Sequence, residues 1–107
     1  MNDHTTSQAV QSTAEVDTEQ ATRYLTQLCK HFQHKLPVTL DAGGGHITFT
    51  IGECRLHADS GVLRLSLTAP DDARLVQLQD VVVRHLVRFA FREPLQIAWS
   101  SGQRGPG

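Results

Sequence analysis

Apolar residues recur at helical spacing in two segments of the chain. The first segment runs from about Thr18 to Lys35, and the second opens at Pro70-Asp71-Asp72 and runs to about Phe91. Each segment carries one apolar stripe with polar side chains opposite, which predicts two amphipathic helices. Pro37 and Pro94 end them, because proline interrupts helical hydrogen bonding. The predicted core positions are Ala21, Leu25, Leu28, Phe32 and Leu36 in the first helix and Leu75, Leu78, Val82, Leu86 and Phe89 in the second.

Between the helices the period of the pattern changes to two, which is typical of strands. Alternation runs from Val38 to Leu40, from His46 through Ala58 and from Leu63 to Leu67, with turns at residues 41–45 and 59–61. We predict three hairpin-connected strands in an antiparallel meander with one apolar face. The opposite, polar face carries His46, Thr48, Thr50, Glu53, Arg55, His57, Arg64, Ser66 and Thr68.

Shorter alternating runs lie before the first helix, at Thr13 to Asp17, and after the second, at Leu95 to Trp99. They add one strand at each end, which gives the order β-α-β-β-β-α-β. A sheet with a single apolar face is covered on one side only. The predicted fold class is therefore α+β, a two-layer sandwich of a mostly antiparallel sheet with both helices on one face.

Length and charge narrow the possibilities further. The chain has 107 residues and a net charge of -1, which predicts one domain at residues 12–100 and makes a nucleic-acid partner unlikely on electrostatic grounds. Residues 1–11 and 101–107 are polar or rich in Gly and Pro, and we expect disordered tails there. No apolar run is long enough for a membrane span and no signal peptide is recognisable, so we expect a cytoplasmic protein.

Two cysteines, Cys29 and Cys54, fall on or beside predicted apolar faces. A reducing cytoplasm disfavours a disulfide between them, and a buried thiol behaves as a small apolar side chain. We therefore predict that both are structural thiols.

Three histidines form the candidate metal site. His31 and His34 lie three apart on the first helix, and His85 lies on the second. On a helical wheel His31 and His34 diverge, so we expect His34 to face solvent while His31 and His85 approach each other across the groove between the helices. Two ligands permit at most weak metal binding, because structural zinc sites need four.

A candidate surface for a ligand or partner consists of exposed basic side chains. His46, Arg55, His57 and Arg64 belong to the polar sheet face. Arg88 and Arg92 belong to a predicted cluster with Phe89, Phe91 and Trp99 near the end of the second helix. No nucleophile and base pair is recognisable, and Gly43 to Gly45 precede a strand instead of a helix, so they predict a hairpin turn and no phosphate site.

Three segments carry a resemblance to a known family: Ala21 to Lys35, Gly52 to Ala58, and Val82 to Phe89. Over about residues 13–100 the chain resembles the small bacterial family catalogued as domain of unknown function 2218. The resemblance implies a compact bacterial protein associated with iron and siderophore handling, with no established reaction to transfer to particular residues.

Two functional hypotheses follow. The first is a binding or accessory module without catalytic activity, which presents its polar sheet face to a protein partner or a small acidic ligand. The alternative is a weak metal-binding protein that uses His31, His34 and His85. The sequence identifies no cofactor and is compatible with a homodimer.

Overall fold

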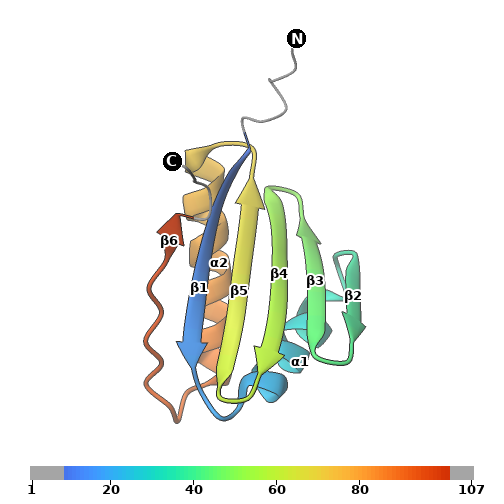
Figure 1. Cartoon of the computed structure of the whole chain (residues 1–107). Coiled ribbons are helices and arrows are strands. Elements are labelled where there is room, and N and C mark those ends of the chain that lie inside the picture. Colours follow the sequence, from blue (N-terminus) through green and yellow to red (C-terminus); the bar gives the residue numbers. More distant parts are fainter. Residues whose placement is uncertain (1–8, 102–107) are drawn as a thin grey trace.

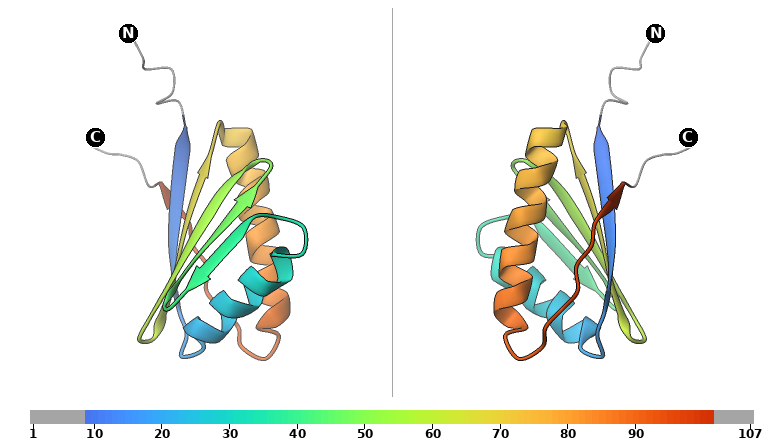
Figure 2. Two further views of the ribbon diagram at one scale, coloured as in Figure 1. Left: turned by 90° about the vertical axis from the view of Figure 1, so that its right-hand side faces the viewer. Right: turned by 90° about the vertical axis from the view of Figure 1, so that its left-hand side faces the viewer.

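The computed structural model describes residues 9–101, and the tails predicted at the two ends lie mostly outside this range. It confirms the α+β class, with a six-stranded antiparallel sheet covered on one face by two helices (Figures 1 and 2). The strand order in the sheet is β2-β3-β4-β5-β1-β6. The elements are β1 (Val10–Asp17), α1 (Ala21–Phe32), β2 (Val38–Asp41), β3 (Gly44–Phe49), β4 (Gly52–Asp59), β5 (Val62–Ala69), α2 (Asp72–Phe89) and β6 (Ser100–Ser101).

The first strand is longer than predicted. β1 begins at Val10, and its register with β5 extends from Val10 opposite Ala69 to Asp17 opposite Val62. Residues 10 and 11 therefore belong to the sheet and not to a tail. Val10 and Gln11 show no alternating pattern of their own, and only the pairing with β5, more than 50 residues later in the chain, makes them part of a strand.

Four strands, instead of the predicted three, lie between the helices. The run from His46 to Ala58 is divided by a turn at Thr50 and Ile51, so that Phe49 at the end of β3 pairs with Gly52 at the start of β4. The short run at Val38 is a strand of its own and forms the sheet edge next to β3. The apolar pattern continued across this turn, which hid the reversal from sequence reasoning.

The last predicted strand is displaced along the chain. Side chains from Leu95 to Trp99 alternate between partly buried and exposed, as predicted, but only Ser100 and Ser101 pair with β1. The preceding segment runs beside β1 without a hydrogen-bonded ladder (Figure 1). Its apolar side chains still pack against the core, so burial and not strand pairing positions it.

Both helices end earlier than predicted, at Phe32 and Phe89. At the start of α2, the Asp71 carboxylate accepts a hydrogen bond of 2.8 Å from the backbone N–H of Arg74, as expected of an N-cap residue. Before α1, the Thr18 hydroxyl oxygen accepts a 3.0 Å bond from the backbone N–H of Gln20. The first bond caps α2, whereas Gln20, the N-cap residue of α1, makes no capping bond with its side chain.

The centre of the core agrees with the prediction, whereas three aromatic positions do not. Leu28, Leu65 and Leu86 are buried between the sheet and the helices. The rings of Phe32, Phe49 and Phe89 were expected there too, but each is only half-buried. The three rings pack against the edge of the core and keep part of their surface in contact with solvent. Phe32 and Phe49 pack edge to face at 5.0 Å between ring centroids. The cost of truncating them should be correspondingly lower than for a fully buried ring.

A glycine in β3 allows α1 to lie close to the sheet. A Cβ atom on Gly45 would lie 2.5 Å from the Cys29 Sγ of α1, far inside van der Waals contact. Cys29 itself is completely buried. Without a side chain at position 45, the Cys29 thiol fills the space directly.

We predict that Gly45→Ala destabilises the protein by about 1–3 kcal/mol, because the added methyl group overpacks the contact with Cys29. In a Cys29→Ala background the same substitution should cost clearly less, since the sulfur has been removed. Chemical denaturation of the four proteins of this double-mutant cycle measures the coupling. Strictly additive free energies of unfolding would show that the helix and strand do not meet as described.

Candidate functional site

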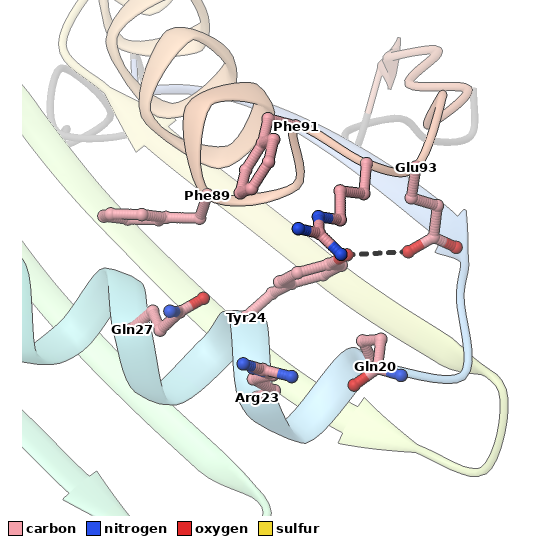
Figure 3. Close-up of a pocket in the computed structure, with 8 residues that line it drawn as sticks. Gln20, Arg23, Tyr24, Gln27, Phe89, Phe91 and Glu93 are labelled. Carbon is pink, nitrogen blue, oxygen red and sulfur yellow. Dashed lines mark hydrogen bonds between the residues drawn. The ribbon is translucent and has the colours of Figure 1, made fainter.

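A pocket of about 540 Å³ lies between α1 and the turn that follows α2 (Figure 3). We call it the seam pocket, because it lies where the two helices meet. The first helix contributes polar side chains, and the end of the second helix contributes aromatic and charged ones. Its lining residues are Gln20, Arg23, Tyr24, Gln27, Phe89, Phe91, Arg92 and Glu93.

One carboxylate ties the two walls of the seam pocket together. Glu93 Oε1 accepts a 2.7 Å hydrogen bond from the Tyr24 hydroxyl and a 2.9 Å bond from the Thr18 hydroxyl. Burial of Tyr24, and next its hydrogen bond to Glu93, raise the pKa of the phenol. Tyr24 therefore stays protonated at neutral pH and acts as a structural donor, which makes it unsuitable as a general base.

Two arginines of the seam pocket form no ion pair with any residue that the structure describes. Arg23 and Arg92 are exposed, and neither belongs to any ion pair found among residues 9–101. Arg64, Arg74 and Arg84, which lie elsewhere, each pair with a carboxylate. The lining of the seam pocket thus carries two arginines and one carboxylate, Glu93, and therefore an excess of positive charge.

An apolar ring accompanies this charge. The guanidinium of Arg92 lies 5.4 Å from the ring centroid of Phe91, whose surface is 77% exposed. The arginine can bind an anionic group of a ligand. The aromatic ring can contact the hydrocarbon part of the same ligand. The end of α2 therefore suits a ligand that carries an acidic group and can also contact an aromatic ring.

The predicted sheet-face residues lie on one face, but most of their charges are already compensated. His46 Nε2 lies 2.7 Å from Glu53 Oε1, and His57 Nε2 lies 3.1 Å from Asp59 Oδ1. Arg64 donates to Glu15 across β1 and β5 and also to Asp59. Among the four predicted residues of this face, Arg55 alone makes no such pair with a described residue. The face is polar but nearly neutral.

The predicted aromatic and arginine cluster is divided in two. Phe91 and Arg92 line the seam pocket, whereas Trp99 lies beside β1 and the start of α2, in a hollow shared with Val10 and Leu75. The expectation of one cluster was wrong because the segment after α2 turns back along β1. Residues eight positions apart in sequence therefore lie at different places on the surface.

The three predicted metal ligands do not converge. The rings of His31 and His85 approach to 4.9 Å between centroids across the two helices, as predicted, while His34 is exposed. The 2.7 Å contact of His85 Nδ1 with the Val81 carbonyl oxygen places the ring proton on Nδ1. Within residues 9–101 no group of three His, Cys, Asp or Glu side chains could hold a metal ion.

Electrostatics around His31 is also unfavourable for a cation. Partial desolvation of the exposed His31 ring, and then coulombic interaction with His85, Arg88, His34 and Lys35, lower the pKa of His31. The charges of Arg88 and Lys35 would also repel a divalent metal. We find no support for metal binding at these histidines.

Sequence reasoning missed Arg23, Tyr24, Gln27 and Glu93 as members of one site. A signal for part of it does exist, because residues 20–40 and 81–92 contain basic side chains and no Asp or Glu. Both segments border the seam pocket. The partner of the Tyr24 hydroxyl, 69 positions away, could not be read from the pattern.

Comparison with known proteins identifies the family and a similar solved structure. A model of DUF2218, described as an uncharacterised protein conserved in bacteria, matches residues 13–100. The chain belongs to the DUF2218 family. The NMR structure of PA4090 from Pseudomonas aeruginosa shares 42% sequence identity and a TM-score of 0.73 with this DUF2218 protein. The match covers 85% of this chain and 95% of PA4090.

A search among curated proteins finds no match. Among the described residues, no helix is long and apolar enough to cross a membrane. The family relationship therefore supports the fold and leaves the function to be argued from the site.

We predict that Cys29 and Cys54 react slowly with a thiol reagent in the native protein and rapidly once it is unfolded. Both side chains are fully buried, and burial raises the pKa of each thiol, so little thiolate is present at neutral pH. Labelling followed by mass spectrometry, with and without denaturant, measures both rates. Fast native labelling of either cysteine would contradict the buried assignment.

We also predict that His31 makes folding less favourable at acidic pH. Its folded pKa is lowered, so the unfolded chain binds the proton more readily, and stability is lost as pH falls below the ordinary histidine range. His31→Gln should flatten the decrease in stability between neutral and mildly acidic pH, measured by denaturation. The exposed His34→Gln serves as the matched control, and equal slopes for both variants would contradict the assignment.

Proposed function

We propose that this DUF2218 protein is a binding module without catalytic activity of its own, and that it takes a small organic acid in the seam pocket. The observation that carries the proposal is the presence on the walls of one pocket of two arginines, Arg23 and Arg92, that form no ion pair within residues 9–101 and outnumber the single carboxylate of Glu93. Arginine binds carboxylates well because its planar fork can donate two parallel hydrogen bonds.

The shape of the site supports a small ligand. The bond from Tyr24 to Glu93 holds the two walls together before any ligand arrives, which reduces the entropy lost on binding. Phe89 and Phe91 add apolar surface on the α2 side of the pocket. A few polar groups around an apolar wall are typical of small-molecule sites.

Charge compensation favours the seam pocket over the open sheet face. On the sheet face a ligand would have to displace existing pairs, such as Arg64 with Glu15 and His46 with Glu53. In the seam pocket, Arg23 and Arg92 need give up no acidic partner among the described residues. Carboxylates that chelate ferric iron belong to the proposed ligand class, so an association with iron handling is one specific form of the proposal.

We predict that citrate, malate or benzoate binds in the seam pocket and that Arg23→Ala and Arg92→Ala each weaken binding about tenfold. A charge-assisted hydrogen bond contributes about 1.5–3 kcal/mol, and 1.4 kcal/mol corresponds to a factor of ten. Titration calorimetry at low ionic strength measures the affinities, and ferric citrate tests the iron-linked form. Chemical shift changes should concentrate at residues 20–27 and 89–93.

Arg84→Ala is the matched control, because Arg84 is an exposed arginine on α2 that pairs with Asp80 outside the pocket. It should leave the affinities unchanged. Failure of all three acids to bind, or binding that resists both seam substitutions, would overturn the proposed function.

A further inference from the structure

The Oε1 atom of Gln27 is the one buried side-chain nitrogen or oxygen without a hydrogen-bond partner among the described residues. This atom has less than 1 Å² of accessible surface and accepts no hydrogen bond. Gln27 lies one helical turn after Arg23 on the same side of α1 and lines the seam pocket. In Figure 3 the amide lies on the α1 wall, with Phe89 across from it.

An unpaired buried amide oxygen is unusual and destabilising, because the atom has lost its bonds to water without replacing them. The oxygen and nitrogen of a glutamine amide can exchange places by rotation of the terminal group. The pocket wall therefore requires a partner that can donate to an oxygen or accept from an NH₂ group. A hydroxyl group satisfies both requirements.

Phe91 and Arg92 line the same pocket from the turn after α2, and both are exposed. Their side chains can therefore adjust to a ligand while the bond from Tyr24 to Glu93 remains in place. Arg23 and Gln27 lie one helical turn apart on α1, so a ligand whose carboxylate is bound by Arg23 lies near the Gln27 side chain. Because Gln27 Oε1 is buried, the amide must turn toward the pocket to bind that ligand.

We propose that the ligand of the seam pocket is a hydroxy acid, whose carboxylate is bound by Arg23 and Arg92 and whose hydroxyl group hydrogen-bonds to Gln27. Gln27 is then a specificity-determining residue, because an acid without the hydroxyl group leaves its amide unpaired. This inference rests on the proposed function and narrows its ligand class. It follows from the presence, in the lining of one pocket, of a buried amide oxygen and two arginines that all lack partners within residues 9–101.

Matched acids that differ by one hydroxyl group test the inference. Malate is succinate with one added hydroxyl, and citrate is tricarballylate with one added hydroxyl. At slightly alkaline pH all four are fully ionised, so each pair has equal charge. We expect the hydroxy acid of each pair to bind about tenfold more tightly, since pairing a buried polar group changes affinity by roughly this factor.

Two variants of the folded full-length chain identify the residue responsible. Gln27→Met keeps the length of the side chain and removes the amide. The affinity for malate should therefore fall to that for succinate, while the affinity for succinate stays unchanged. Gln20→Met is the matched control on the same wall and should retain the preference for malate, because Gln20 has no orphaned buried atom. Thermal denaturation of both variants checks that they remain folded.

The outcomes separate this inference from the proposed function. Equal, arginine-dependent binding of malate and succinate would overturn the hydroxy-acid inference and leave the proposed function standing. Failure of the four acids and of benzoate to bind would overturn both. A preference for malate that survives Gln27→Met but is lost in Gln20→Met would also refute the role assigned to Gln27.

Discussion

The sheet of this protein has only one apolar face, and the arrangement of everything else depends on burying it. Leu56, Leu65 and Leu67 are buried on that face, while their sequence neighbours point to the open side. Both helices must therefore cover this face, because leaving its apolar side chains in water would be unfavourable. The polar side chains of the other face can remain in contact with water. Two helices placed side by side necessarily create a seam between them, and the candidate site lies at one end of that seam.

Contacts across the seam are sparse and chemically mixed. Aromatic rings and two histidines occupy one part of it, with His31 lying 5.7 Å from Phe89 between ring centroids. Farther along, the hydrogen bonds from Tyr24 and Thr18 to Glu93 hold the turn after α2 against α1. Phe89 belongs to both regions, because it also lines the seam pocket. The end of α2 is thus shared between packing and the proposed binding site.

Charge is distributed unevenly in a chain whose net charge is only -1. Carboxylates gather on the open sheet face and at the start of α2, where they pair with Arg64 and Arg74. The seam side keeps its arginines unpaired within the described residues. Such separation raises the local attraction for anions without making the whole protein basic, which the overall composition conceals. For a family described only as uncharacterised, this asymmetry provides a physical basis for choosing one surface over another.

The sequence by itself determined the layers of this fold. Periods of 3.6 and two placed both helices and most strands, and the single apolar face required both helices on one side. The sequence pattern also predicted that Cys29 and Cys54 lie in the core and that His31 approaches His85, because these positions follow from periodicity alone.

Tertiary structure alone decided the rest. The extension of β1 to Val10, the reversal at Thr50 and the displacement of β6 to Ser100 depend on pairing between distant segments. The seam pocket depends on a turn that brings Glu93 back to Tyr24, and the orphaned state of Gln27 depends on what surrounds it in space. A local pattern records which face of an element is apolar, but not which polar groups from other elements will meet there.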